Sequence, residues 1–250
     1  MINLNIARQL EIAQEASMEA GKFLIDNSNN IQKVIFSNEK DIKIQADILS
    51  EKIIKDIIMS KSDFPILGEE SGLSSDDLSN TFWVVDPLDG TANYIRGIPI
   101  CCISIALISN LEPVLGVIYD FNNKNFYEGS IESKSLCNKV KISVSNISDP
   151  AEGVLITGLP NNTDYSEDAM KKMIKDFQSW RKVRMFGSAA LASAYIASGK
   201  ADAYSETKTY LWDVAAGAAI VNAAGGNAVI SNFNDKFQVN VLFKNSSLSI

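Results

Sequence analysis

Histidine is absent from the 250-residue sequence. This absence excludes hydrolysis by a Ser-His-Asp triad, nucleophiles activated as Cys-His pairs, phosphohistidine chemistry and zinc sites built on imidazole. Acidic residues are plentiful, because 30 Asp and Glu residues stand against 23 Lys and Arg residues. Any hydrolytic chemistry in this protein must therefore be carried by carboxylates.

Cysteine and long apolar runs are scarce as well. The three cysteines, Cys101, Cys102 and Cys137, are odd in number and lack zinc-ligand spacing, so we expect buried free thiols. The longest nearly apolar run, residues 98–108, falls well short of the roughly 20 residues that span a bilayer. Residues 1–24 have the spacing of an amphipathic helix and not the basic-then-apolar pattern of a signal peptide. These patterns predict a cytoplasmic protein without a membrane partner.

A broad basic surface is the third missing feature. The formal net charge of -7 and the sequence pI of about 4.8 argue against nucleic acid or an acidic membrane as a partner. The basic stretch at residues 171–184 is expected to be a solvated helix face. An apolar content of 46% can fill a substantial core, which predicts one large domain or two packed subdomains.

Strand and helix patterns alternate along the chain. The predicted strands are at 40–45, 64–67, 82–85, 101–108, 113–121 and 183–186, and the predicted helices begin at Asp47 and lie at 166–180, 188–198 and 213–224. The strands from residue 101 onward predict an antiparallel meander. A shift to Ser, Asn, Asp and Pro at residues 144–153 predicts an N-terminal subdomain of residues 1–145 and a C-terminal subdomain of residues 146–250.

The segment DPLDGT places two carboxylates on one turn. Asp86 ends an apolar strand, Pro87 interrupts the ladder, and Asp89-Gly90 turns the chain so that Thr91 can begin a helix. Backbone N–H groups at a helix start suit a phosphate, and a divalent cation held by the aspartates would offset the charge. An ordinary Asp-Gly turn explains the hexapeptide about equally well.

Two further acidic positions favour the first interpretation. Glu69, in GEES, also ends an apolar strand, so it lies at the same sheet edge if the two strands are neighbours. A solvated loop is the alternative for this position. Asp213 precedes an Ala-rich helix that ends at Gly225-Gly226, so it has an alternative explanation as the N-cap residue.

The segments GEES, WVVDPLDGT and LWDVAAGAAIVNAAGG resemble, in this order and spacing, the three signatures of the inositol monophosphatase family. The resemblance covers nearly the whole chain. It implies an α+β fold, a layered α/β/α/β/α sandwich of the inositol monophosphatase and fructose-1,6-bisphosphatase type. The metal ligands that it implies are Glu69, Asp86, the carbonyl of Leu88, Asp89 and Asp213.

The resemblance also implies catalytic and substrate-binding residues. Water activation would fall to Glu69 and Thr91, with Asp47 placed against the threonine. Helix capping is the alternative role for Asp47. The implied substrate contacts are Asp89, Gly90, Thr91, Gly187, Ser188, Ala189, Glu206 and Asp213. For Ser188 a helix cap is the alternative, and for Glu206, which matches a glutamate that accepts inositol hydroxyls, an exposed surface position is the alternative.

The implied reaction is hydrolysis of a small soluble phosphate monoester by a water molecule that two or three Mg²⁺ ions activate. Inositol monophosphate is the first candidate substrate. Magnesium is preferred because every implied ligand is a hard oxygen, and Mn²⁺ is the alternative ion. Fructose 1,6-bisphosphate, histidinol phosphate and phosphoadenosine phosphate stay open as substrates, as does a regulatory binding protein that keeps the metal site. Lithium inhibition and a homodimer are also implied.

Overall fold

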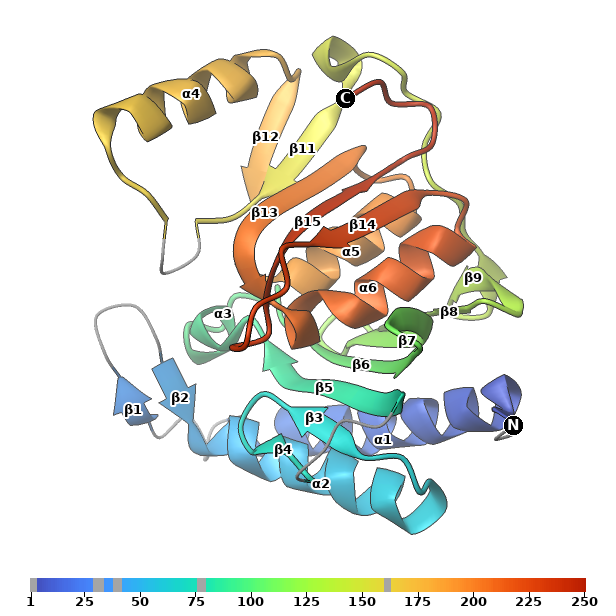
Figure 1. Cartoon of the computed structure of the whole chain (residues 1–250). Coiled ribbons are helices and arrows are strands. Elements are labelled where there is room, and N and C mark those ends of the chain that lie inside the picture. Colours follow the sequence, from blue (N-terminus) through green and yellow to red (C-terminus); the bar gives the residue numbers. More distant parts are fainter. Residues whose placement is uncertain (1–3, 29–33, 38–41, 76–79, 160–162) are drawn as a thin grey trace.

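The computed structural model describes residues 4–28, 34–37, 42–75, 80–159 and 163–250 (Figure 1). The helices are α1 (Ile6–Asn27), α2 (Gln45–Lys61), α3 (Thr91–Ile95), α4 (Glu167–Gln178), α5 (Ala189–Ala197) and α6 (Leu211–Ala223), and η1 (Pro150–Glu152) is a 3₁₀ turn. None of the helices in these ranges is long and apolar enough to cross a membrane.

One sheet has eight strands in the order β10-β9-β8-β7-β6-β5-β3-β4. The strands are β3 (Ile66–Gly68), β4 (Gly72–Leu73), β5 (Thr81–Asp89), β6 (Cys102–Ser109), β7 (Glu112–Asp120), β8 (Asn125–Ser130), β9 (Ser133–Cys137) and β10 (Val140–Lys141). Strands β6 to β9 pair consecutively and antiparallel, which confirms the predicted meander. Strand β3 is parallel to β5, so their carboxyl ends meet at one edge of the sheet.

A second sheet has five strands in the order β12-β11-β13-β15-β14. Its strands are β11 (Val154–Thr157), β12 (Lys182–Met185), β13 (Ala203–Tyr210), β14 (Asn227–Ser231) and β15 (Gln238–Lys244). The pairing of β13 with β15 shifts register between Glu206 and Thr209, and Lys208 there has φ 60°. Such a bulge bends a strand and re-aims its side chains. A separate hairpin joins β1 (Val34–Ser37) to β2 (Ile42–Ile44).

Helices and sheets form alternating layers. Helices α1 and α2 lie against one face of the eight-stranded sheet, and α5 and α6 lie between the two sheets (Figure 1). Helix α4 lies on the far side of the five-stranded sheet, where Phe177 packs near Leu155 and Ala203. Their neighbours Ile156 and Tyr204 face α5 and α6 instead, as strand alternation requires. The layered α/β/α/β/α fold implied by the sequence is confirmed.

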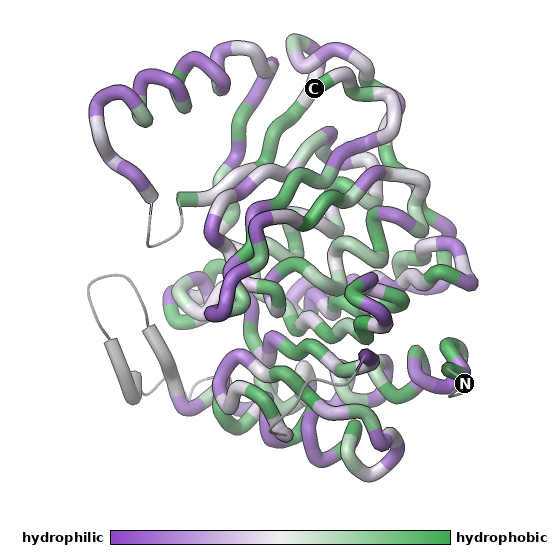
Figure 2. Tube along the Cα trace, viewed as in Figure 1, coloured by the Kyte–Doolittle hydropathy of each residue, from purple (hydrophilic) through white to green (hydrophobic). Residues whose placement is uncertain are grey.

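Small residues allow the central layer to pack closely. A Cβ added to Gly217 on α6 would lie 2.3 Å from Ser193 Cβ on α5. A Cβ on Gly116 of β7 would lie 2.2 Å from the carbonyl oxygen of Ala216. Helices α5 and α6 are apolar over most of their length, because both are buried between the two sheets. Helix α4 is largely hydrophilic and has no fully buried residue (Figure 2).

Most predicted elements agree with these bounds to within a few residues. Helix α6 begins at Leu211, two residues before its predicted start, so Asp213 is the third helical residue and not the N-cap. All three cysteines are free, as predicted, but Cys137 is only half-buried. The core between the sheets includes Tyr127 and Val241, from both predicted subdomains, and the division at residue 145 stays a prediction.

Candidate functional site

The parallel strands β3 and β5 bring two acidic side chains together at one sheet edge. The backbone N–H of Glu69 donates to the carbonyl of Val85 at 3.1 Å, which fixes Glu69 beside the end of β5. The carboxyl groups of Glu69 and Asp86 lie close enough for each to affect the pKa of the other. Burial raises the pKa of both groups well above the ordinary range, and the charges of neighbouring carboxylates raise both pKa values further.

The DPLDGT turn has the geometry expected from its sequence. The backbone N–H of Leu88 donates to Asp86 Oδ1 at 3.0 Å, and Gly90 has φ 91°. A Cβ at Gly90 would lie 2.8 Å from the carbonyl oxygen of Ile100, so both the backbone conformation and the space require glycine. Helix α3 then begins at Thr91, as predicted.

Thr91 and Asp47 meet across two elements that are far apart in the sequence. Thr91 Oγ1 lies 3.2 Å from Asp47 Oδ1 and 3.1 Å from the carbonyl oxygen of Leu88. Asp47 is 2% exposed, in the first turn of α2. The structure therefore brings together the predicted pair, although its catalytic role stays a prediction.

Helix α2 also supports both acidic loops through two residues that the sequence analysis missed. Ser50 Oγ donates to the carbonyl of Pro87 at 2.9 Å. The Glu51 carboxylate accepts from the backbone N–H groups of Glu70 at 2.8 Å and of Ser71 at 3.1 Å. Asp47, Ser50 and Glu51 have i, i+3, i+4 spacing, so a polar stripe beside the apolar face of the helix was the available signal.

The Asp89 carboxylate caps the amino-terminal end of α5. Its carboxylate accepts from Ser188 Oγ at 2.5 Å and from the backbone N–H groups of Ala190 at 2.8 Å and Ala189 at 3.3 Å. Ser188 also accepts from the backbone N–H of Leu191 at 3.2 Å, so its alternative role as a helix cap is present. Burial raises the pKa of Asp89 to about 6, and the hydrogen bond from Ser188 opposes that rise. The predicted substrate turn therefore touches the DPLDGT turn directly.

Asn93 is a third residue that the sequence analysis missed. Its side-chain nitrogen lies 2.7 Å from the carbonyl oxygen of Ile100, 2.8 Å from that of Phe186 and 3.4 Å from that of Gly187. Gly187 has φ 70°, which favours glycine there. Asn93 thus ties α3 to the turn before α5, and its position just after DPLDGT was the only local signal.

Glu206, on β13, and Asp213, in the first turn of α6, complete the predicted set. Asp213 Oδ2 accepts from Thr209 Oγ1 at 2.7 Å and from the backbone N–H of Tyr210 at 3.0 Å. Glu206 Oε2 accepts from Tyr204 Oη at 2.9 Å. Burial raises the pKa of each carboxyl to about 7, and the charge of Asp89 adds to both shifts. Glu206 is half-buried and not the exposed residue of the alternative interpretation.

The four carboxylates Glu69, Asp86, Asp89 and Asp213 fit a hard divalent cation. Each lies in the electrostatic field of at least one of the others, and in the described part of the chain the ion pairs are exposed ones that involve none of them. A cation would offset this concentrated negative charge, and oxygen donors suit Mg²⁺. Among the described residues no three acidic or thiol groups already surround one point.

Comparison with known proteins gives consistent matches over almost the whole chain. A sequence model of the inositol monophosphatase family matches residues 6–245. A protein of Xylella fastidiosa named Nus factor SuhB is 38% identical over 221 residues, which cover 87% of this chain and 80% of that protein. The inositol-1-monophosphatase of Synechocystis sp. is 32% identical over 227 residues, which cover 87% and 77%. Among solved structures, the inositol monophosphatase from Anabaena (Nostoc) sp. PCC 7120 has a TM-score of 0.82 at 30% identity and covers 97% of this chain and 92% of that one.

Proposed function

Because the chain belongs to the inositol monophosphatase family, we propose that it is a Mg²⁺-dependent phosphatase of small soluble phosphate monoesters, with inositol monophosphate as the first candidate substrate. Fructose 1,6-bisphosphate, histidinol phosphate and phosphoadenosine phosphate are the alternative substrates. Two or three Mg²⁺ ions would be held by Glu69, Asp86, the Leu88 carbonyl, Asp89 and Asp213. Bound there, they would offset the charge of the phosphate and lower the pKa of the attacking water.

The observation that carries the proposal is the position of Thr91 between Asp47 and the acidic sheet edge. When the Thr91 hydroxyl donates to Asp47, 3.2 Å away, its oxygen lone pairs stay available to accept a hydrogen bond from water. Glu69, at the end of the neighbouring strand, is the group that takes the second hydrogen bond from that water and then its proton. The water oxygen bonds to phosphorus as the phosphorus–oxygen bond to the alcohol breaks. The leaving alkoxide takes a proton from a second water molecule, and Glu69 returns the proton that it accepted to the solvent.

The substrate side of the site lies where the DPLDGT turn meets the turn before α5. Asp89, Gly90, Thr91 and the turn Gly187-Ser188-Ala189 lie together through the hydrogen bonds of Asp89 and Asn93. We assign this junction to the phosphate and the adjoining hydroxyl groups of the alcohol. Glu206 and Asp213 would accept hydrogen bonds from hydroxyls farther along the alcohol.

The experiment is a phosphate-release screen over inositol, sugar, histidinol and nucleotide monoesters, with and without Mg²⁺. Release that depends on Mg²⁺ and falls on addition of Li⁺ is expected for at least one ester. Absence of Mg²⁺-dependent release from every ester would overturn the proposal. Sedimentation of the purified protein tests the homodimer that the family resemblance implies.

A regulatory role is a second candidate, and it is favoured by the name of one relative. The protein of Xylella fastidiosa that is 38% identical to this chain is called a Nus factor. A cell that carries only the Glu69→Gln variant separates the two functions. If this variant restores the growth of a strain that lacks the protein, the protein has a role that needs no turnover. If it does not restore growth, the growth defect is assigned to loss of the phosphatase reaction.

A further inference from the structure

Tyr204, on β13, is a tyrosine at a position where packing alone would accept phenylalanine. The residue is 1% exposed and belongs to the core between the two sheets, where its ring meets that of Phe243 at a centroid distance of 5.9 Å and an angle of 74°. Its hydroxyl group donates to Glu206 Oε2 at 2.9 Å. Replacing both partners of such a buried pair by apolar groups of the same shape is often nearly neutral, so core stability does not explain the pair.

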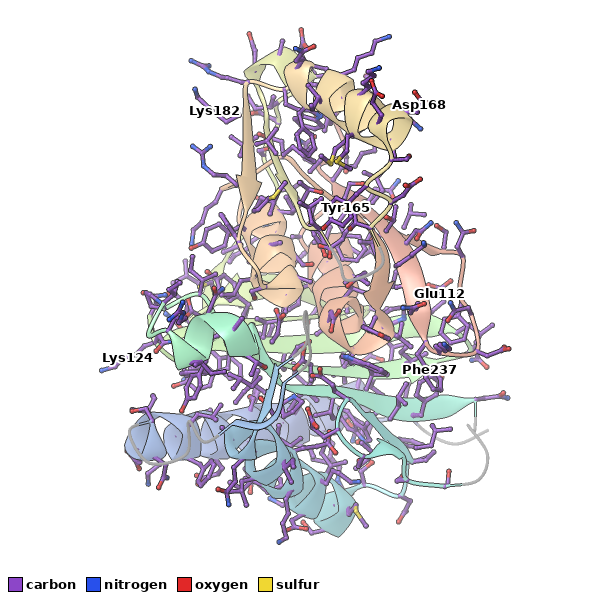
Figure 3. All side chains as sticks on the ribbon, turned by 90° about the vertical axis from the view of Figure 1, so that its left-hand side faces the viewer. Glu112, Lys124, Tyr165, Asp168, Lys182 and Phe237 are labelled. Carbon is purple, nitrogen blue, oxygen red and sulfur yellow. The ribbon has the colours of Figure 1, made fainter. Side chains whose placement is uncertain are left out.

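The pair lies near the proposed metal ligands. Tyr204 and Glu206 are two residues apart on one strand, so both face the central layer of α5 and α6 and not α4, on which Asp168 is labelled in Figure 3. Burial, followed by the charges of nearby carboxylates, raises the pKa of Tyr204 well above its ordinary range, so the phenol keeps its proton and donates a hydrogen bond. Asp89 and Asp213 are two of these carboxylates, which places the pair within electrostatic reach of the metal site.

Gly158, just after β11, restricts the plane of the Glu206 carboxylate. Strands β11 and β13 are parallel, and the pairing of Thr157 with Ser205 places the next residue, Gly158, beside Glu206. A Cβ added to Gly158 would lie 2.4 Å from Glu206 Oε2, 2.7 Å from Cδ and 2.8 Å from Oε1. Because these three distances are similar, Gly158 approaches the carboxylate from outside its plane. Hydrogen bonds to such a group lie close to its plane, so this approach leaves both oxygens open to donors.

A second pair of a glycine and a glutamate in this protein shows how such a carboxylate is used. A Cβ added to Gly68 would lie 2.6 Å from Oε2, 2.7 Å from Cδ and 2.8 Å from Oε1 of Glu51. Each oxygen of Glu51 then accepts one backbone N–H of the loop after β3. In the described part of the chain, Glu206 Oε2 accepts from Tyr204, and Glu206 Oε1 accepts from no residue. An oriented acceptor that the protein does not use indicates a ligand that donates a hydrogen bond.

We propose that Tyr204 is a positioning residue for substrate recognition: together with Gly158 it holds the Glu206 carboxylate so that Oε1 accepts a hydrogen bond from a hydroxyl group of the substrate alcohol. This inference rests on the proposed phosphatase function, and it favours phosphate monoesters of polyols as substrates. Because two contacts fix the carboxylate before the substrate arrives, less rotational freedom is lost on binding. An ester whose alcohol has no further hydroxyl group gains nothing from Tyr204.

The test removes one phenolic hydroxyl group from each of two buried tyrosines. Tyr204→Phe takes the donor from Glu206 and keeps the ring. Tyr127→Phe is the matched control, because Tyr127 is 0% exposed in the same core and its hydroxyl group lies 3.2 Å from Lys200 Nζ. With inositol 1-phosphate, we expect Tyr204→Phe to raise KM about three- to tenfold and to keep kcat within about twofold of the wild type. With phenyl phosphate, and for Tyr127→Phe with both esters, KM and kcat should stay within about twofold of the wild type.

A double-mutant cycle shows whether Tyr204 acts through Glu206. In the Glu206→Ala background the carboxylate is absent, so Tyr204→Phe should leave KM for inositol 1-phosphate within about twofold. A rise as large as the one in the wild-type background would overturn the positioning role. Thermal unfolding checks that each variant is folded. If Tyr204→Phe does not fold, Tyr204→Met, which fills the space without a hydroxyl group, takes its place.

The outcomes separate this inference from the proposed function. In a folded Tyr204→Phe protein, equal changes in KM for the two esters, or no change with inositol 1-phosphate, would overturn the inference and leave the phosphatase intact. Mg²⁺-dependent release by the wild type from phenyl phosphate but from no polyol ester would have the same meaning. Absence of Mg²⁺-dependent release from every ester of the screen would overturn the proposed function, and this inference with it.

Discussion

Helices α2 and α4, on the outer faces of the two sheets, are packed with different tightness. Helix α2 supports the acidic loops with side chains that are almost completely buried: Asp47 is 2% exposed and Glu51 is 3% exposed. Helix α4 has no fully buried residue and stands over a cavity of about 730 Å³. Groups that carry out chemistry must be held in a narrow geometry. The difference therefore predicts that substitutions on α2 that face the acidic loops change turnover with every ester, whereas substitutions on α4 change turnover little.

Glu69→Gln should produce the largest effect, because it removes the proposed proton acceptor on the tightly built side. We expect turnover to fall about 10²- to 10⁴-fold with every ester, since the change does not depend on the alcohol. The free energy of unfolding should not fall, because the substitution removes one charge from a buried acidic cluster. Steady-state phosphate release and thermal unfolding check the two parts. Glu70→Gln is the matched control from the adjacent position, and a loss as large as that of Glu69→Gln would contradict the assignment.

Glu51→Ala tests whether α2 positions the loop that carries Glu69. The substitution leaves the backbone N–H groups of Glu70 and Ser71 without their acceptor, which should lower the free energy of unfolding by about 1–3 kcal/mol. We expect kcat to fall about tenfold with all esters and KM to change less, because the substrate contacts lie elsewhere. Urea unfolding and steady-state kinetics measure both effects. Lys52→Ala, on the exposed side of the same helix, should change neither stability nor kcat. If Glu51→Ala lowered kcat with only one ester, α2 would not support the part of the reaction that all esters share.

Glu206 provides a pH test on the substrate side. Its pKa is raised from 4.5 to about 7 in the folded protein, so between these values the folded state keeps a proton that the unfolded state releases. The wild type therefore loses stability as pH rises from about 4.5 to 7, and the loss is complete above pH 7. In Glu206→Gln the free energy of unfolding should not show this fall with pH. Relative to the wild type, it should therefore rise by on the order of 2 kcal/mol between pH 4.5 and pH 8. Urea unfolding at the two pH values, in EDTA, checks this, and a pH-independent difference would show that Glu206 titrates normally.

Gly158→Ala should have the smallest effect and should depend on the substrate. Its new Cβ would displace the Glu206 carboxylate and weaken the hydrogen bonds from this carboxylate to the alcohol. We expect KM for inositol monophosphate to rise about two- to tenfold. An aryl phosphate, which has no hydroxyl for Glu206, should keep its KM. Steady-state kinetics with both esters provide the measurement. Equal changes in both KM values would mean that Glu206 has no part in recognition.

Agreement between sequence and structure is best where local chemistry has few alternatives. The glycine conformation at Gly90 and the helix start at Thr91 follow from local turn and helix preferences. Strand β5 extends to Asp89, three residues beyond its predicted end at Asp86, because its pairing with β6 resumes after a register shift between Asp86 and Asp89. The parallel pairing of β3 with β5 was a condition of the prediction and is present. Asp213 was predicted as the N-cap of its helix and is its third residue, because an acidic residue can cap a helix from either position.

The supporting residues could not be identified from the sequence, because their partners are distant in the chain. Glu51 contacts a loop 19 and 20 residues away, and Asn93 contacts Phe186 across 93 residues. A buried Glu and an Asn in a short helix each have many ordinary explanations when read alone. The cavity has no sequence signature, because it is the space left between the apolar face of α4 and the bulged strand β13.

The sequence by itself determined which chemistry is available: the absence of histidine leaves carboxylates, and the three acidic segments identify the family and the hard-oxygen donors. The tertiary structure alone decided which of those groups meet, since strand pairing and helix packing bring Asp47 to Thr91 and Asp89 to Ser188. Residue types fix what a side chain can bind, whereas distances between segments far apart in the chain arise only when the layers pack.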